Sequence, residues 1–272
     1  GAEIALFGNT LQIRGASKGR TEYRVTLKQG ITDIFGQTLA EDETVTFRVG
    51  SSEPSMSVPN EMFAVLDPAA APSYTVYTMN YGTLFVRAYR VQPEDWPAFQ
   101  QYMHKTMRQE SPGDPPGEKV MDQRIKVDAK TDELAQTNID LSALLGESGQ
   151  GYEHLILIVE PERNLVDFVR RRPQPVLRVW LQASKLALDA FVDSEEMTAW
   201  VTSLSNGAPL ADVELTLFPG GATATTNESG VATLSLAKVA AGETGGYVLA
   251  RRGDDTALLP QSAYPWMVEG WQ

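Results

Sequence analysis

The chain of 272 residues contains no cysteine. Disulfide bonds, thiolate metal sites and cysteine nucleophiles are therefore excluded, although the compartment is not defined by this absence. Histidine is nearly as scarce, because only His104 and His154 occur, fifty positions apart. Neither has the spacing of a zinc motif, so we expect both to be hydrogen-bonded in the structure or to face solvent.

Positive charge is also in short supply, with 23 Lys and Arg against 35 Asp and Glu and a formal net charge of −12. Nucleic acid and anionic membrane surfaces both require a cationic face, so neither is expected as a partner. The longest aliphatic run, Leu155 to Val159, is far below a membrane span. The chain begins Gly-Ala-Glu inside an expected strand without a signal peptide, and we expect it to be part of a longer protein.

Catalytic signatures are missing as well. The sequence holds no nucleophile elbow, phosphate loop or dinucleotide-binding glycine pattern. Two acidic clusters, Asp254-Asp255 and 193–196, lack the alternating ligands and glycine of a calcium loop, and we interpret them as solvated turns. The sequence therefore predicts no catalytic residue, no cofactor-binding residue, no metal ligand and no enzyme.

What the sequence does contain is short strands of period two, seen best in residues 198–250. Val213, Leu215 and Leu217 alternate with polar neighbours, which is typical of a strand with one buried face. Asn- and Gly-containing turns at 205–209 and 226–230 separate such strands, since these residues tolerate left-handed backbone. The pattern predicts β-sandwiches.

Three units are expected along the chain. Residues 1–51 resemble in size the C-terminal half of an immunoglobulin-like domain, or a truncated one. A β-sandwich is expected over 52–173, and another over 174–272. The residues 51–59 have the composition of a linker, and the basic step Arg170-Arg171-Arg172-Pro173 is interpreted as an exposed linker between domains.

The elements expected within these units are as follows. The first unit has strands at Ile4–Phe7, Leu11–Arg14, Thr21–Leu27 and Thr44–Val49. The second has strands near 61–66, 73–79, 83–91, 122–127 and Tyr152–Val159. A helix is predicted over Pro93–Met107, where Trp96, Phe99, Met103 and Met107 recur at helical spacing as a packing face. A loop rich in proline follows at Glu110–Glu118, and the third unit opens with a strand pair, Val176–Gln182 and Lys185–Val192. The fold class is thus all-β, in tandem β-sandwich domains with one short helix inserted in the middle domain.

Three stretches in this order resemble bacterial alpha-2-macroglobulins. Residues 19–27 and 30–39 look like the end of that family's immunoglobulin-like domain near the N-terminus. Residues 65–68, Asn80, 84–91 and 94–96 are similar to the macroglobulin domain that follows. Residues 199–210, 226–232 and 250–259 resemble a further macroglobulin domain. The resemblance implies tandem immunoglobulin-like and macroglobulin β-sandwich domains, with macroglobulin-like sandwiches over 52–173 and 174–272.

The resemblance implies a non-catalytic framework fragment of a broad-spectrum protease inhibitor in the periplasm, anchored to the membrane through an N-terminal lipoprotein segment. Its implied partners are proteases, met through the full-length protein, other domains of the same chain and envelope proteins. The family's Cys–Gln thioester is absent here, and no functional residue of the family can be carried over. An adhesin- or receptor-type array of immunoglobulin-like modules, binding a protein or glycan, is the alternative.

Overall fold

The computed structural model describes residues 3–7, 10–15, 17–59, 62–67, 70, 72–108, 110, 113–145, 152–163, 168–169, 173–236 and 246–262. In this part of the chain, strands dominate and pair into six sheets, while one long helix is present. The all-β class with one inserted helix, predicted from the sequence, is confirmed. Residues 170–172 and 263–272 lie outside the described residues, so the predicted linker at Arg170–Arg172 is not described.

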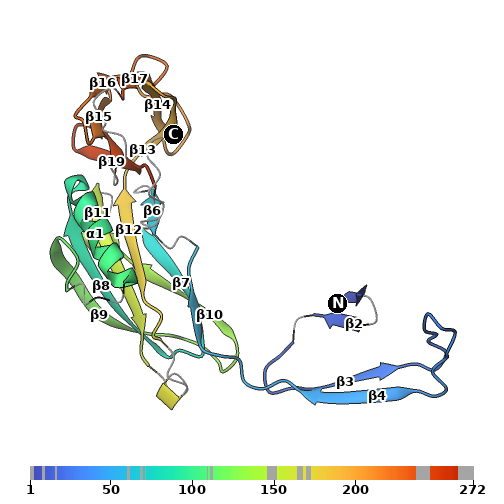
Figure 1. Ribbon diagram of the computed structural model, residues 1–272. Helices are drawn as coiled ribbons and strands as arrows, with labels where there is room; N and C mark the ends of the chain where they lie inside the picture. Colours follow the sequence, from blue (N-terminus) through green and yellow to red (C-terminus); the bar gives the residue numbers. More distant parts are fainter. Residues whose placement is uncertain are drawn as a thin grey trace.

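The N-terminal residues form two separate antiparallel pairs of strands. The strands are β1 (Glu3–Phe7) with β2 (Thr10–Arg14), and β3 (Glu22–Leu27) with β4 (Glu43–Arg48). Tyr23 and Phe47 are directly opposite in the second pair and stack with ring centroids 5.7 Å apart. In Figure 1 the β3–β4 hairpin extends away from the rest of the molecule. We call this hairpin the arm.

The middle of the chain is a sandwich of two sheets. One sheet has the order β10-β7-β5, from strands β5 (Ser55–Ser57), β7 (Ser73–Met79) and β10 (Leu134–Asp140). The other has the order β6-β12-β11-β8-β9, from strands β6 (Phe63–Leu66), β8 (Thr83–Val91), β9 (Glu118–Lys126), β11 (Glu153–Pro161) and β12 (Leu177–Ala183). Apolar side chains from both sheets, such as Val76, Ile139, Leu84 and Leu157, meet in one buried cluster.

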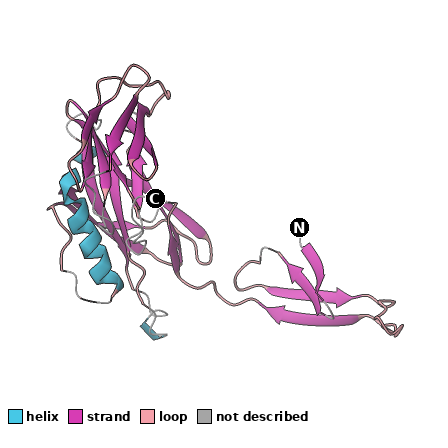
Figure 2. Ribbon diagram, turned by 45° about the horizontal axis from the view of Figure 1, so that its top comes forward, coloured by secondary structure: helices cyan, strands magenta, loops and turns pink. Residues whose placement is uncertain are grey.

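The helix α1 (Trp96–Met107), preceded by the 3-10 turn η1 (Pro93–Asp95), lies along the outer face of the five-stranded sheet (Figure 2). Trp96, Phe99 and Met103 are buried against this face, as the helical spacing predicts, whereas Met107 is 42% exposed. The strands β11 and β12 are therefore covered on both faces, which explains their nearly continuous burial.

The C-terminal sandwich also has two sheets. Their orders are β13-β14-β17 and β16-β15-β18-β19, from β13 (Leu186–Val192), β14 (Glu196–Ser203), β15 (Glu214–Phe218), β16 (Thr223–Thr225), β17 (Val231–Ser235), β18 (Tyr247–Arg252) and β19 (Asp255–Pro260). Val213, Leu215 and Leu217 are fully buried in its core, as their alternation predicts.

Strand β18 alternates between two cores. Val248 and Ala250 point into the C-terminal sandwich, while Tyr247 and Leu249 join the cluster that contains Trp96 and Trp180. The outer face of this four-stranded sheet is thus packed on the end of the middle sandwich where α1 begins (Figure 1). An apolar core, and not only a linker, connects the two.

Several expected elements require correction. The strands at 176–182 and 185–192 were expected to pair, but β12 pairs with β11 and β6, and β13 pairs with β14. The reason is that β12 carries apolar side chains on both faces, so it belongs inside a sheet that is covered twice. The expected linker at 51–59 contains β5, which pairs with β7. Strands β10 and β16 were not expected, and β9 begins at Glu118, before the expected 122.

Candidate functional site

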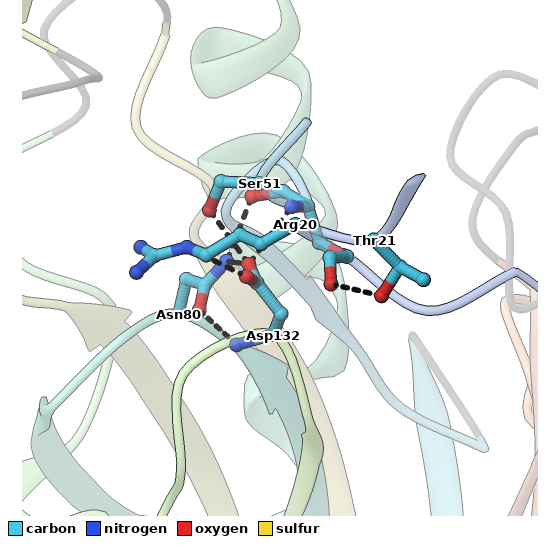
Figure 3. Close-up of polar contacts among 7 residues, drawn as sticks. Arg20, Thr21, Ser51, Asn80 and Asp132 are labelled. Atoms are coloured by element: carbon cyan, nitrogen blue, oxygen red, sulfur yellow. Dashed lines mark hydrogen bonds and ion pairs between the residues drawn. The ribbon is translucent and has the colours of Figure 1, made fainter. Parts of the chain in front are cut away.

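Clusters of side-chain hydrogen bonds hold two junctions of the molecule, and the first joins the arm to the middle sandwich (Figure 3). Asp132, in the loop between β9 and β10, has a side chain that is only 7% exposed. Its Oδ1 accepts hydrogen bonds from Ser51 Oγ at 2.6 Å, from Ser52 N at 2.8 Å and from Asn80 Nδ2 at 3.0 Å. Its Oδ2 lies 3.1 Å from Arg20 Nε. The carboxylate of Asp132 therefore contacts both chain segments at the base of the arm, the one before β3 and the one after β4.

Asn80 completes the same cluster from the turn between β7 and β8. Its Oδ1 accepts from the backbone N–H of Asp132 at 2.8 Å, and its Nδ2 also donates to the carbonyl of Ser52 at 2.7 Å. Arg20 N donates to the carbonyl of Gly50 at 3.0 Å, which ties the two chain segments at the base of the arm to each other. We call Arg20, Ser51, Ser52, Asn80 and Asp132 the first clamp.

The backbone of the first clamp is unusual. Arg20, Asn80 and Asp132 have φ values of 56°, 56° and 63°. These values lie in the left-handed region, which residues other than glycine rarely adopt. Such conformations persist only where the surroundings hold them. Gly19 adds a steric condition, because a Cβ at this position would lie 2.8 Å from the Cβ of Asp132. The first clamp therefore restricts the backbone conformation at the base of the arm.

Hydrogen bonding also sets the charge of the first clamp. The bonds from Ser51 and then Asn80 stabilise the carboxylate of Asp132 and hold its pKa below the usual value, with further help from Ser52 and Arg20. Asp132 is consequently an anion throughout the physiological range. The described polar contacts of this carboxylate are hydrogen bonds from Ser51, Ser52 and Asn80 and the ion pair with Arg20. They hold the arm against the middle sandwich.

The second junction joins the middle and C-terminal sandwiches through Asp255, at the start of β19. Its Oδ1 accepts from Ser184 Oγ at 2.7 Å, and its Oδ2 accepts from Lys185 N at 3.0 Å. Ser184 Oγ in turn accepts from Leu186 N at 3.0 Å. These contacts fix the two residues between β12 and β13, and we call Ser184, Lys185 and Asp255 the second clamp.

Asp255 differs from Asp132 in its surroundings. It is 5% exposed, and burial raises its pKa above the usual value despite the bonds from Ser184 and Lys185. The sequence-based interpretation of Asp254-Asp255 as a solvated turn is therefore wrong for Asp255 and correct for Asp254, which is exposed. The other acidic cluster is a solvated turn as expected, in which Asp193 accepts from the N–H groups of Glu195 and Glu196.

His154 lies beside the second clamp, buried on β11. Trp180 Nε1 donates to its Nδ1 at 3.2 Å, and its Nε2 lies 3.0 Å from Thr256 Oγ1. Because the indole can only donate, the neutral imidazole carries its proton on Nε2 and donates to Thr256. Burial lowers the pKa of His154 to about 4, so the ring is neutral at pH 7. The imidazole thus bridges the two sandwiches as a hydrogen-bonded core residue.

Two further contacts close this interface. Gln182 Oε1 accepts from Leu258 N at 2.8 Å, and Arg251 pairs with Glu94 at 3.6 Å at its edge. Tyr247 is buried beside the helix, and burial, with the nearby charges of Glu94 and Asp95, raises its pKa to about 12. The interface is therefore apolar at its centre. Hydrogen bonds of His154 and Gln182 cross it, whereas the buried Nε1 of Trp96 has no hydrogen-bond partner among the described residues.

The two histidines of the chain lie on different elements. His104 lies on α1 and His154 on β11, and the described contacts of His154 do not include His104. Across the described residues, no group of three or more His, Asp or Glu side chains is arranged to hold a metal ion. No described helix is long and apolar enough to cross a membrane.

Sequence reasoning missed both clamps. Asp132 meets Ser51 across 81 positions and Asp255 meets Ser184 across 71, and no local motif marks either contact. The one available signal was weak, namely polar residues at turns between strands.

The C-terminal part of the chain is similar to a known protein family. Residues 183–265 match the family described as bacterial alpha-2-macroglobulin MG3 domain. The match begins where β12 ends and the second clamp starts. A search of curated proteins finds no match.

Solved structures extend the likeness to nearly the whole chain. A crystal structure of native alpha-2-macroglobulin from Escherichia coli, spanning domains MG0-NIE-MG1, is 18% identical, with a TM-score of 0.56 over 95% of this chain and 81% of that chain. The native E. coli protein seen by electron cryomicroscopy is 18% identical, with a TM-score of 0.51 over 95% of this chain and 16% of that chain. Salmonella alpha-2-macroglobulin reacted with methylamine is 17% identical, with a TM-score of 0.52 over 95% and 15%.

The predicted resemblance to bacterial alpha-2-macroglobulins is thereby confirmed: by the family match for the C-terminal sandwich, and in fold for the remainder. This family typically consists of non-catalytic protease inhibitors. The chain spans about 16% of the native E. coli protein that it matches, and its fold resembles the N-terminal domains of that protein.

Proposed function

We propose that this chain is a non-catalytic framework segment of a bacterial alpha-2-macroglobulin-like protease trap in the periplasm. The observation that carries the proposal is the agreement in fold over 95% of the chain with the N-terminal domains of the E. coli protein. The two clamps support it, because each fixes a linker between sheets through hydrogen bonds from a serine hydroxyl and the next backbone N–H to one carboxylate. The partners are then the other domains of the same protein and, through the complete trap, proteases.

We further propose a division into three units with a changed second boundary. The chain covered falls from 95% to 77% when the solved E. coli segment lacks MG0, a difference of about 49 of 272 residues. This agrees with a first unit over 1–51. The sheet membership of β12 and the family match from residue 183 support a boundary at Ser184, instead of the expected 173.

The experiment uses the full-length gene product that contains this chain. It is incubated with trypsin-like and chymotrypsin-like endopeptidases, whose activity is followed on a large protein and on a small peptide substrate. A trap is expected to abolish cleavage of the large substrate while sparing the small one, because a caged protease admits only small molecules. Equal inhibition of both substrates, or of neither, contradicts the proposal.

A further inference from the structure

A groove of about 290 Å³ opens on the middle sandwich, between the start of β12 and the strand β5. Met56 comes from β5, Met62 precedes β6, Met103 comes from α1, and Leu177 and Arg178 begin β12. Three methionines in one groove give an apolar and adaptable surface, because the unbranched thioether repacks easily. The groove lies apart from both clamps and takes no part in the proposed framework role.

On each side of the groove lies a strand edge that has no strand partner among the described residues. In the described structure β5 pairs only with β7, so its other edge has no strand partner. On β12, the parallel pairing with β6 begins at Trp180, and residues 177–179 have no described partner on that side. Trp180 N donates to Met62 O toward β6. By alternation the backbone N–H and C=O of Arg178 point to the same edge, where no described strand receives them.

Arg178 places a cation at this edge. Its Nε donates to the hydroxyl of Tyr102 at 3.2 Å, and the guanidinium lies 6.0 Å from the centre of that ring. Among the described residues, no carboxylate pairs with Arg178, and neither of its terminal nitrogens has a hydrogen-bond acceptor. Tyr102 therefore holds one side of the fork and leaves the two terminal nitrogens presented together. In this end-on geometry a guanidinium can donate two hydrogen bonds to one carboxylate.

The strand edges, the apolar groove and the guanidinium of Arg178 together fit one kind of ligand. Unpaired strand edges are satisfied by an extended backbone, an apolar groove by a side chain of that segment, and a guanidinium fork by a carboxylate. We propose that this groove binds an extended peptide segment, which adds as a strand along the edges of β5 and β12 and places an acidic side chain on Arg178. The charge complementarity at Arg178 selects an acidic segment, in a chain that is otherwise strongly acidic.

The probe is a synthetic heptapeptide of alternating valine and threonine with a central glutamate. Binding is followed by nuclear magnetic resonance of methionine methyl groups in the complete chain. We expect saturable shifts at Met56, Met62 and Met103, and none at Met197, which is buried in the C-terminal sandwich. The absence of a saturable shift at these three methyl groups up to millimolar peptide would overturn the proposal.

Two control peptides separate the contributions. A twin with glutamine in place of glutamate is expected to bind about tenfold more weakly, because it loses the charge-assisted fork. A twin that is N-methylated at alternate residues is expected not to bind, since it cannot join a strand edge. Equal affinity of either twin and the parent peptide contradicts the respective part of the assignment.

Protein variants locate the carboxylate. Arg178→Gln should bind the glutamate and glutamine peptides equally, and Arg178→Lys should keep only part of the preference. Arg124→Gln removes the same charge from an exposed position on β9 and should keep the full preference. If Arg178→Gln folds, as judged by an unchanged signal of the Met121 methyl group, which packs on the core of the middle sandwich, and still prefers glutamate tenfold, the site lies elsewhere. The glutamate–glutamine comparison in the parent chain needs no variant at all.

Discussion

The hydroxyl of Ser184 donates to Oδ1 of Asp255 at 2.7 Å, and this contact fixes the two-residue connection between the middle and C-terminal sandwiches. The first clamp repeats the arrangement, because Ser51 Oγ donates to Asp132 Oδ1 at 2.6 Å. In both, the residue after the serine adds its backbone N–H to the same carboxylate. A linker held at a hydroxyl and the adjacent N–H cannot rotate freely about that residue. We interpret the clamps as the devices that set the angles between units.

The first prediction concerns the angle of the arm. Asp132→Ala removes the acceptor for Ser51 and Ser52 and places alanine in left-handed backbone, so the arm should swing over a wider range. Asp132→Asn keeps an acceptor and a residue that tolerates this backbone, and should change the angle less. Since the chain lacks cysteine, spin labels at Thr38→Cys and Gln123→Cys report the distance directly by electron resonance.

We expect one narrow distance distribution in the parent, a broad one in Asp132→Ala, and an intermediate one in Asp132→Asn. Gly19→Ala should also broaden it, because the added Cβ would lie 2.8 Å from the Cβ and Cγ of Asp132. Equal widths in all four proteins would show that the first clamp does not set the arm.

A second prediction follows from the buried imidazole. The pKa of His154 is about 4 in the folded chain, against about 6.5 for an unperturbed histidine, so the unfolded chain binds this proton first. Stability from His154 is therefore complete above pH 6.5 and is lost as the pH falls toward 4, by about 3 kcal/mol in total. Urea unfolding at pH 7, 5 and 4 measures it. His154→Gln should lose less stability over this interval than the parent, and parallel curves for the two would refute the assignment.

The third prediction compares two glycines with almost the same backbone. Gly207 and Gly230 have φ values of 71° and 73°. At Gly207 a Cβ meets nothing within 4 Å, whereas at Gly230 it would lie 2.5 Å from the carbonyl oxygen of Val201. Gly207→Ala should therefore cost about 1–2 kcal/mol for the left-handed conformation alone.

Gly230→Ala carries the same conformational cost and a backbone clash, so it should lose more stability, on the order of 1–3 kcal/mol beyond Gly207→Ala. Thermal unfolding of both variants gives the comparison. Equal losses would mean that the turn at 227–230 can shift away from Val201, and the close approach would then be unimportant.

How far the sequence predicts the fold depends on whether a signal is local. The alternation of Val213, Leu215 and Leu217 and the helical spacing of Trp96, Phe99 and Met103 are local, and both are confirmed. The pairing of β12 is not encoded locally. Two apolar strands that follow one another in sequence are compatible with a hairpin, and only the helix that covers the outer face of the sheet shows that β12 lies inside it. The clamps depend on contacts over 71 and 81 positions, which no periodicity encodes. The same holds for Asp255, whose burial comes from the neighbouring sandwich.

A fourth prediction concerns size. A compact globule of 272 residues has a radius of gyration of about 18–19 Å. The arm extends from the middle sandwich, and the C-terminal sandwich is packed on its far end (Figure 1). Small-angle scattering should therefore give a clearly larger value. A value at the compact figure would mean that the arm folds back in solution.

The central claim is that this chain is a framework and not itself a trap, and one assay tests it most directly. The isolated chain is incubated at near-stoichiometric amounts with a panel of endopeptidases, and the cleavage of a large protein and of a small peptide is followed in parallel. We predict uniform competition with both substrates, ending in cleavage within the loop 110–118. Selective loss of activity on the large substrate would contradict the account, because it would place the trapping function within these residues.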